Sequence, residues 1–399
     1  MSLTSEAVRI GVAGLGRAFV LMQGAFHADP RVRLVAAAAP RAESRAAFED
    51  QYGGAAYDSV EAMCADPEVE AVYIATPHQM HREHVEAAAR HGKHVLVDKP
   101  LAVTLEDGTA MVEAAEAAGV QVIVGPSHSF DAPVRLARDI IESGEFGALR
   151  MIQAFNYTDF LYRPRRPEEL RTEEGGGVLF SQAVHQVDIV RLLAGGMGRQ
   201  ITAMTGDWDP ERPTEGAYSA LIGFEGGAFA TLTYSGYAHF DSDLWMGNVG
   251  ELGHEKPADG YGAARRALKE LDPAREAALK STRTFGSATP LRTPEHHEHF
   301  GPVIALLDRA DLRLTPDGVE IFGNETREFR AAPGTDRPRH GVLDALVDAV
   351  RHGRAPAQTA RWGMASLEVC HAILRSAKDG GAPVRLEHQV KTDHGETSK

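Results

Sequence analysis

Short apolar runs alternate with helical patterns along the first third of the chain. The runs are rich in Val, Ile and Ala and are apolar on both faces. They span residues 8–14, 32–39, 71–75, 93–97 and 120–124. Strands of a parallel sheet that is covered on both sides have this pattern. The Ala-, Glu- and Arg-rich segments between the runs end at glycines, as helices do. Residues 1–125 are therefore predicted to form an α/β domain with a doubly wound (Rossmann) parallel sheet.

After residue 125 apolar positions alternate with polar ones, as they do along antiparallel strands with one buried face. The predicted strands are residues 148–158, 199–207, 217–224, 227–236, 311–315 and 318–323. They predict a C-terminal α+β domain, residues 126–390, with a large, open and mainly antiparallel sheet. This domain would bind substrate and form oligomers. Because an exposed sheet face is expected to be covered by a partner subunit, we expect a homodimer or a homotetramer.

A charged segment interrupts the alternation. Residues 241–300 form an insertion with the helical pattern AARRALKELDPAREAALK, flanked by pieces rich in Gly and Pro. Helix is predicted again over residues 341–379. The polar tail, residues 391–399, is predicted to be loose.

Composition narrows the class of protein. The chain has 399 residues, and its 42 Lys and Arg against 56 Asp and Glu give a net charge of −14. Such a charge argues against a nucleic-acid partner and against an anionic membrane surface. Two cysteines are too few for a disulfide scaffold. We expect no signal peptide, because the N-terminal residues MSLTSEAVRIGVAG lack a basic region followed by an apolar one. We expect no membrane-spanning helix, because no run of about 18 apolar residues occurs. After these exclusions, we expect a cytoplasmic globular protein that binds a small molecule.

A glycine-rich turn follows the first apolar run. Gly14 permits a tight turn, and Gly16 lets the backbone approach a pyrophosphate at the N-terminus of the next helix. Phe19 stands where a third glycine would complete the G-x-G-x-x-G pattern, so a purely structural turn is the alternative. The position after an N-terminal strand favours dinucleotide binding. The cofactor contacts expected here are Gly14, Leu15, Gly16, Arg17 and Ala18.

The end of the second run bears on the choice between NAD and NADP. An acidic residue there binds the ribose 2′-hydroxyl of NAD, whereas a nearby arginine accommodates the 2′-phosphate of NADP. The sequence reads Ala38-Ala39-Pro40-Arg41, without an acid. We therefore expect an NAD(P) cofactor and favour NADP. A solvated Arg41 that opens the next helix is the alternative.

Two motifs carry a family resemblance. The first, residues 74–102, reads IATPHQMHREHVEAAARHGKHVLVDKPLA, and the second, residues 175–188, reads GGGVLFSQAVHQVD. In this order they make the chain similar to the Gfo/Idh/MocA oxidoreductases over nearly its whole length. Residues 157–170 and 361–374 resemble the branch that includes phthalate cis-dihydrodiol dehydrogenases.

The resemblance implies a nicotinamide-dependent oxidoreductase. It places further cofactor contacts at Thr76, Pro77, His81, Asp98 and Lys99. It assigns proton transfer to His185, alone or shared with Lys99. Three positions depart from the family pattern: Asp98 replaces a glutamate, Ser181 an aspartate and Ala183 a glycine.

Lys99 directly follows the fifth predicted strand, at the edge of a parallel sheet where ligands bind. Oxidation of a secondary alcohol needs a hydride acceptor, which the cofactor supplies, and a base for the hydroxyl proton. Partial burial and a nearby nicotinamide cation would lower the pKa of the lysine and let it relay that proton. Pro100 biases Lys99 towards extended backbone, so its side chain can point into the cleft. A surface lysine at a strand end is the alternative.

His185 is the second candidate catalytic residue. The run after the three glycines is helical in pattern, and Asp188 shares a face with His185. Asp188 would orient the imidazole or simply pack beneath it, and a satisfied core histidine is the alternative. Ser181 brings a hydroxyl but no charge to the substrate, and Gln182 is expected to take over part of that polar contact.

An arginine cluster stands out in this acidic chain. Arg163 and Arg165 lie in YRPRRPEE, which two prolines make an ordered loop. Because arginine suits two-pronged contacts with carboxylates, a loop over the cleft would favour an acidic substrate. Pairing with nearby glutamates or an oligomer contact is the alternative. His128 and Phe130 are further candidates for the substrate pocket.

No metal site is expected. Residues 296–299 read HHEH, but adjacent histidines in one run seldom converge on one ion. No second cluster has typical ligand spacing.

The sequence thus predicts NAD(P)-dependent hydride transfer to or from a secondary alcohol or ketone of a cyclic substrate, with a carboxylated cis-dihydrodiol favoured. A sugar or cyclitol dehydrogenase is the alternative within the same family. An NAD-dependent glycoside hydrolase and a non-catalytic cofactor-binding sensor are the alternatives from other classes.

Overall fold

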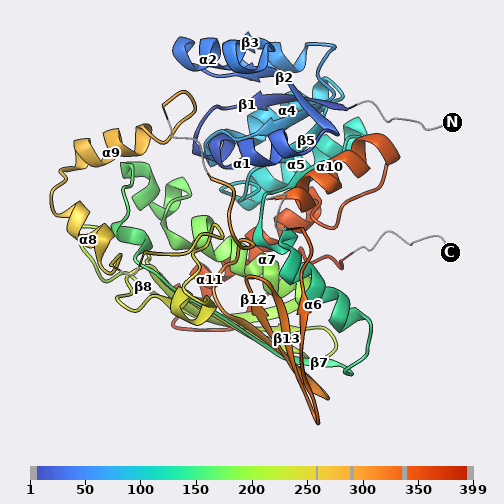
Figure 1. Ribbon diagram of the computed structural model, residues 1–399, viewed down its shortest axis with the longest axis vertical. Helices are drawn as coiled ribbons and strands as arrows, with labels where there is room; N and C mark the ends of the chain where they lie inside the picture. The colour runs from blue at the N-terminus through green and yellow to red at the C-terminus, as the bar shows by residue number, and fades with distance from the viewer. Residues whose placement is uncertain (1–6, 258, 288–291, 335–338, 393–399) are drawn as a thin grey trace.

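The computed structural model describes residues 7–257, 259–287, 292–334 and 339–392. Two sheets lie one above the other, with helices α7 (Val184–Leu193) and α11 (Ala360–Lys378) between them (Figure 1). Of the predicted loose tail, residues 393–399 lie outside the described residues.

The first sheet is the predicted doubly wound sheet. Within the described residues it has six strands, all parallel, in the order β3-β2-β1-β4-β5-β6. They are β1 (Val8–Ala13), β2 (Val32–Ala38), β3 (Ala55–Tyr57), β4 (Ala71–Ile74), β5 (His94–Val97) and β6 (Val122–Val124). The five predicted strands are confirmed, and β3 escapes prediction because so short a strand carries no periodic pattern. The strand order reverses between β1 and β4, where such sheets bind ligands.

Helices cover both faces of the first sheet. One face packs against α1 (Arg17–Ala28), α2 (Ala42–Tyr52) and α10 (His340–His352), and the other against α3 (Val60–Cys64), α4 (His81–Arg90) and α5 (Leu105–Ala118). Phe19, Phe48 and Leu346 are buried in the first layer. Val85 and Met111 are buried in the second.

The second sheet is large, open and mainly antiparallel, as predicted. Among the described residues its order is β14-β13-β12-β11-β7-β10-β9-β8-β15, and only β7 and β10 pair in parallel. The strands are β7 (Leu149–Tyr157), β8 (Gly198–Gly206), β9 (Ala217–Phe224), β10 (Phe229–Ser235), β11 (Val303–Leu307), β12 (Ala310–Thr315), β13 (Gly318–Gly323), β14 (Arg327–Ala331) and β15 (Val384–Arg385). The sequence pattern does not predict β11, β14 or β15.

The two faces of the second sheet differ. Helices α6 (Ala132–Glu142), α7 and α11 pack on one face. The other face exposes large apolar side chains, among them Met204, Leu221, Phe229 and Phe322. Among the described residues, none of the helices combines the length and the apolar character that crossing a membrane requires.

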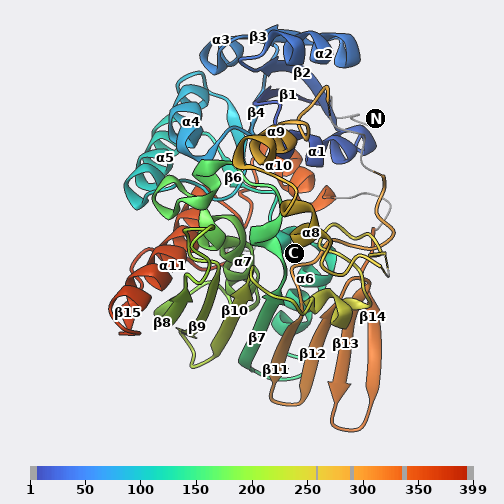
Figure 2. The same ribbon diagram turned by 90° about the vertical axis from the view of Figure 1, so that its left-hand side faces the viewer.

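Two predicted helical segments are each divided in two. In the insertion, Pro273 begins α9 (Pro273–Ser281) separately from α8 (Ala263–Leu268), and Asp272 caps α9 by accepting from the backbone N–H of Arg275 at 2.8 Å. In the segment 341–379, Gly353 ends α10 in the left-handed conformation before α11 begins. The insertion leaves the second sheet after β10, and α9 lies beside the first sheet in both views (Figure 1, Figure 2).

Candidate active site

A cavity of about 1320 Å³ lies along the carboxyl edge of the first sheet. Strand ends and the glycine-rich turn line one side, and residues 157–183, α7 and the insertion line the other. Every predicted site residue except His81 lines this cavity. The ring nitrogens of His81 lie 3.1 Å from the backbone carbonyl oxygens of Thr76 and Pro100. His81 is therefore buried beneath the site and holds two strand ends together, so the structure does not bring it to the cavity.

The glycine-rich turn between β1 and α1 is shaped for close approach. Gly14 has a φ of +93°, and a Cβ there would lie 2.9 Å from the carbonyl oxygen of Ala75. A Cβ on Gly16 would meet no atom nearer than 3.9 Å, so the N-terminus of α1 stays open towards the cavity. Free backbone N–H groups and the helix dipole favour a phosphate at that end. The residues present therefore fit the pyrophosphate of a dinucleotide.

The ends of β2 and β3 form the neighbouring part of the cavity. Arg41 is exposed there and donates to Thr284 Oγ1 at 2.8 Å. The parallel register pairs Ala38 with Tyr57, so Asp58 lies at the same edge and also lines the cavity. Sequence reasoning missed Asp58 because this acid follows the short strand β3 rather than β2. This end of the cavity therefore offers both an arginine, Arg41, and a carboxylate, Asp58, to a ribose or its 2′-phosphate.

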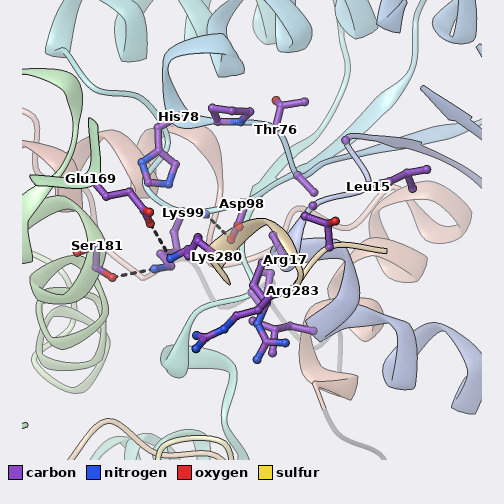
Figure 3. A pocket seen from close by; sticks show the side chains of 18 of the residues that line it. Leu15, Arg17, Thr76, His78, Asp98, Lys99, Glu169, Ser181, Lys280 and Arg283 are labelled. Carbon is purple, nitrogen blue, oxygen red and sulfur yellow. Dashed lines mark hydrogen bonds and ion pairs between the residues drawn. The ribbon is translucent and has the colours of Figure 1, made fainter. Parts of the chain in front are cut away.

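Lys99 lies just beyond the carboxyl end of β5 and points into the cavity (Figure 3). Its ammonium donates to the backbone carbonyl of Ser181 at 2.8 Å. Burial lowers the pKa of Lys99 below its usual 10.5, although the negative charge of Asp98 raises this pKa in part. Asp98 accepts from the backbone N–H of Lys99 at 2.9 Å, and burial raises the pKa of its carboxyl group. Lys99 therefore loses its proton more readily than an exposed lysine does.

His185 lies in the first turn of α7, directly after the π-helical turn Leu179–Ala183. Its ring forms no hydrogen bond with the part of the chain that the structure describes, and Nδ1 is fully buried. Burial lowers the pKa of His185 well below 6.5, and the charges of Lys99 and His128 lower it further. The imidazole is therefore neutral at pH 7, and one of its ring nitrogens can accept a hydrogen bond.

Asp188 does not contact His185. Its carboxylate accepts a hydrogen bond from Ser127 Oγ at 2.6 Å and another from the indole N–H of Trp362. It thus joins α7 to the segment after β6 and to α11. Of the two expected roles, orientation of the imidazole is wrong, and a packing role agrees with these contacts.

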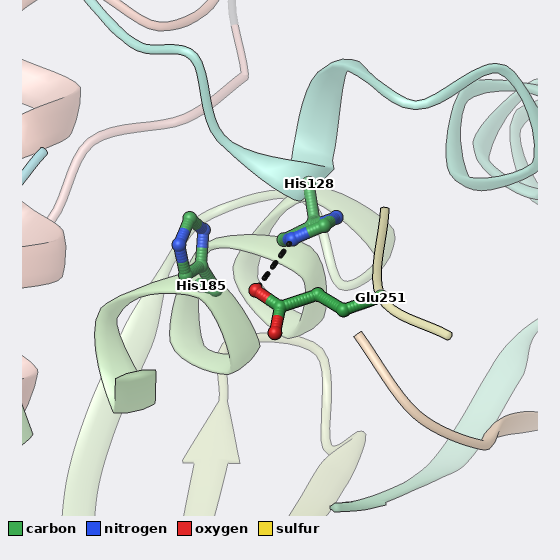
Figure 4. Close-up of side chains that lie close together, drawn as sticks. All are labelled: His128, His185 and Glu251. Carbon is green, nitrogen blue, oxygen red and sulfur yellow. Dashed lines mark ion pairs between the residues drawn. The ribbon is translucent and has the colours of Figure 1, made fainter. Parts of the chain in front are cut away.

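His128 and Glu251 complete the surroundings of His185 (Figure 4). The His128 and His185 ring centroids are 4.7 Å apart. His128 Nδ1 lies 2.6 Å from Asp131 Oδ2, and Nε2 lies 3.6 Å from Glu251 Oε1. Burial favours neutral His128, but the two carboxylates outweigh it and raise the pKa of His128 to about 10. Burial also opposes ionisation of Glu251, yet the His128 cation holds the pKa of Glu251 at about 2. Both groups are therefore charged near pH 7.

These side chains are also of the types that bind metal ions. One nitrogen each of His128 and His185 and one oxygen of Glu251 lie within 4.8 Å of one another, a cluster that the sequence does not reveal. Of the histidines in residues 296–299, His296 contacts Asp317, His297 contacts the Ala332 carbonyl and His299 contacts the Val249 carbonyl.

The two arginines of the predicted loop behave differently. The Arg165 guanidinium group stacks on the Phe160 ring at 3.5 Å and donates to the Phe160 carbonyl at 2.9 Å. These contacts with the protein leave fewer of its donors for a substrate. Arg163 Nε lies 3.1 Å from Asp159 Oδ1, while its terminal nitrogens bond to none of the described residues. Burial opposes the charge of Arg163, but Glu251 and Asp159 raise its pKa. Arg163 therefore has free donors at the cavity.

Ser181 and Gln182 face the cavity with most of their polar atoms already engaged. The Ser181 hydroxyl donates to the Gly177 carbonyl, and the Ser181 carbonyl holds Lys99. Gln182 Oε1 accepts from the Tyr234 hydroxyl at 3.1 Å, and Nε2 donates to the Ser181 carbonyl at 3.0 Å. The Ser181 backbone thus contributes to the site as directly as its side chain.

The insertion supplies lining residues that sequence reasoning missed, among them Glu251, Lys280 and Arg283. Lys280 donates to Glu169 at 2.8 Å, and burial, together with the charge of Arg165, lowers the pKa of Lys280 to about 8. No local sequence pattern predicts that these residues line the cavity, because tertiary contacts with distant segments place the insertion there.

Comparison with known proteins agrees with this geometry. Residues 8–126 match the model of an oxidoreductase family with an NAD-binding Rossmann fold, and residues 134–254 match the GFO/IDH/MocA C-terminal domain. A 1-carboxy-3-chloro-3,4-dihydroxycyclohexa-1,5-diene dehydrogenase of Comamonas testosteroni is 46% identical over 377 residues, which cover 93% of this chain and 95% of that protein.

Two further relatives show the range of the similarity. A solved structure of a Bordetella bronchiseptica RB50 protein is 40% identical, with a TM-score of 0.91 over 95% of this chain and 100% of that one. A 1,5-anhydro-D-fructose reductase of Ensifer adhaerens is 39% identical over 192 residues, 46% of this chain and 55% of that protein. The similarity spans both sheets and both motifs, and the chain belongs to the Gfo/Idh/MocA family of NAD-binding oxidoreductases.

Proposed function

We propose that this protein is an NAD(P)⁺-dependent dehydrogenase that oxidises a secondary alcohol of a carboxylated cis-dihydrodiol. The observation that carries the proposal is the convergence of Lys99 and His185, both with pKa values lowered by burial, in one cavity beside the glycine-rich turn. The name of the Comamonas relative describes a carboxylated dihydroxycyclohexadiene as its substrate, which supports this substrate class.

Lys99 is proposed as the group that accepts the hydroxyl proton. The bound nicotinamide supplies the hydride acceptor. The Ser181 carbonyl fixes the position of the Lys99 amine, and burial favours its neutral form. His185 stands beside it as a neutral imidazole and shares or relays the proton.

Arg163 and Glu251 are proposed to bind opposite ends of the substrate. The free terminal nitrogens of Arg163 suit a substrate carboxylate. The ionised Glu251 suits the donors of two vicinal hydroxyls. The family pattern has an aspartate at Ser181, and Glu251 would restore a carboxylate to the site from the insertion. The other proposed substrate contacts are His128, Phe130, Arg165, Ser181 and Gln182.

NADP is proposed as the preferred cofactor. Arg41 at the end of β2 supports this preference, whereas Asp58 at the same edge favours NAD. The remaining proposed cofactor contacts are Gly14, Leu15, Gly16, Arg17, Ala18, Thr76, Pro77 and Asp98.

A homodimer or homotetramer through the second sheet is also proposed. The exposed Met204, Leu221 and Phe229 on its open face support an interface there, because apolar patches of this kind mark association surfaces. In this arrangement residues 1–125 bind the cofactor and residues 126–390 bind substrate and the partner subunit.

A substrate screen tests the proposed function. Carboxylated cis-dihydrodiols, the same diols without the carboxylate, cyclitols and sugars are each offered with NAD⁺ and with NADP⁺, and the absorbance of the reduced nicotinamide is followed. We expect the highest kcat/KM for a carboxylated dihydrodiol, with NADP⁺ preferred.

Other outcomes replace the proposal. A higher kcat/KM for a sugar or cyclitol would make the protein a sugar or cyclitol dehydrogenase, a class to which the Ensifer relative points. Cleavage of a glycoside without net change in absorbance would make it a glycoside hydrolase. Cofactor binding without turnover of any substrate would support a sensor.

A further inference from the structure

A short segment of the insertion docks on the glycine-rich turn. We call residues 281–287, which start at the last residue of α9, the strap. The backbone N–H of Phe285 donates to the carbonyl of Leu15 at 3.2 Å. The Phe285 side chain is 5% exposed, and its ring centroid lies 5.2 Å from that of Phe19 and 6.1 Å from that of Tyr52. The strap is therefore part of the apolar layer around α1 and α2, although it comes from the other half of the chain.

The helix before the strap is fixed to the opposite side of the cavity. Glu276 of α9 is buried and accepts from two nitrogens of Arg212 at 2.8 and 3.1 Å. Lys280 at the end of α9 donates to Glu169. The strap thus spans the cavity from the substrate side to the glycine-rich turn, and Arg283 and Thr284 line that cavity.

Two arginines meet where the strap crosses the turn. Arg17 begins α1, and Arg283 of the strap approaches it (Figure 3). Neither guanidinium group forms a hydrogen bond or an ion pair within the described part of the chain. Burial, followed by the charges of Arg283 and Arg339, lowers the pKa of Arg17. Like charges held together in this way are stabilised when an anion lies between them.

We propose that Arg283 is a cofactor-binding residue that contacts the pyrophosphate of the dinucleotide together with Arg17, with Phe285 holding the strap over the glycine-rich turn. The proposal rests on dinucleotide binding, which the family implies, and not on the identity of the alcohol. The pyrophosphate is favoured over the 2′-phosphate, because Arg283 meets Arg17 at the N-terminus of α1, whereas the neighbouring Thr284 meets Arg41.

Binding measurements on the full chain test this assignment without any substrate. The variant Arg283→Gln is titrated with ADP-ribose by calorimetry, and with NADH and NADPH by nicotinamide fluorescence. Loss of a charge-assisted hydrogen bond is expected to raise Kd by about ten- to a hundredfold for all three ligands. The matched control is Arg275→Gln, an arginine of the same insertion with a 74% exposed side chain outside the cavity, which should leave Kd unchanged.

Three results would overturn the proposal. The first is a Kd of Arg283→Gln for ADP-ribose within about twofold of that of the unaltered protein. The second is a loss of affinity confined to NADPH, which would assign Arg283 to the 2′-phosphate. The third is an equal loss of affinity in Arg275→Gln.

A second variant, Phe285→Ala, separates docking of the strap from folding. It should raise Kd for ADP-ribose while the thermal unfolding of the cofactor-free protein stays cooperative; a cooperative protein with unaltered Kd would contradict the role of Phe285. Failure of the substrate screen would leave these binding results unaffected.

Discussion

The two sheets contribute to the site in different ways. The parallel sheet places its residues at strand ends, where the register aligns Ala13 with Ile74 and Ile74 with Val97. The glycine-rich turn, Thr76 and Lys99 therefore meet at one edge. The antiparallel sheet contributes mainly through its connecting segments, which include residues 157–183 and the insertion.

This difference separates two kinds of chemistry. In the proposed function, cofactor binding and proton transfer rest on a backbone framework that crossover connections and strand order largely determine. The proposed recognition of the substrate rests on long connections, which vary more easily without loss of the fold. The following predictions test whether the division holds, from the largest expected effect to the smallest.

The largest effect is expected from Lys99→Ala. Loss of the proposed base should lower kcat by about 10²–10⁴-fold, while Kd for NADPH changes little. Steady-state kinetics and nicotinamide fluorescence measure the two quantities. Lys269→Ala, an exposed lysine of the insertion outside the cavity, is the control and should behave as the unaltered protein. Near-normal turnover in Lys99→Ala would remove the lysine from the mechanism.

A smaller, substrate-specific effect is expected from Arg163→Ala. Its free terminal nitrogens are proposed to bind the substrate carboxylate, so KM for a carboxylated diol should rise by about ten- to a hundredfold. KM for the uncharged diol should stay the same, and this pair of substrates is the internal control. Arg165→Ala should lower the melting temperature, because Arg165 is stacked on Phe160, and should raise KM for the carboxylated diol less than Arg163→Ala does. If KM for both diols rises equally, Arg163 does not bind the carboxylate.

The smallest effect is a shift in the pH profile of Glu251→Gln. His128, with its pKa raised to about 10, and Glu251, with its pKa lowered to about 2, keep their charges near neutral pH. His185 is already neutral there, so the rise of kcat/KM with pH should report deprotonation of Lys99. Burial lowers the pKa of Lys99, while the charges of Asp98 and Glu251 raise it. Removal of the Glu251 charge should therefore lower that pKa and move the rise to lower pH.

The control for this profile is Glu270→Gln, an exposed glutamate of the insertion outside the cavity, which should not shift it. A shift of the Glu251→Gln profile to higher pH, or none, would show that the rise does not belong to Lys99.

The sequence best predicts the position of a residue that follows a strand end. Lys99 and the glycine-rich turn line the cavity as expected, because a strand and the residues after it are contiguous in the chain. Asp188 shows the limit of the method. Its spacing from His185 is compatible with a contact, but its hydrogen-bond partners Ser127 and Trp362 lie far away in the sequence.

The sequence by itself determined the parallel sheet, the glycine-rich turn, the family and the position of Lys99, since these depend on local periodicity and on contiguous motifs. Only the tertiary structure decided that His81 lies beneath the cavity, that Glu251 faces His128, and that the strap carries Arg283 to Arg17. The physical reason is that burial and charge pairing at the site join segments that are distant in the chain, and no local pattern encodes which distant segments will meet.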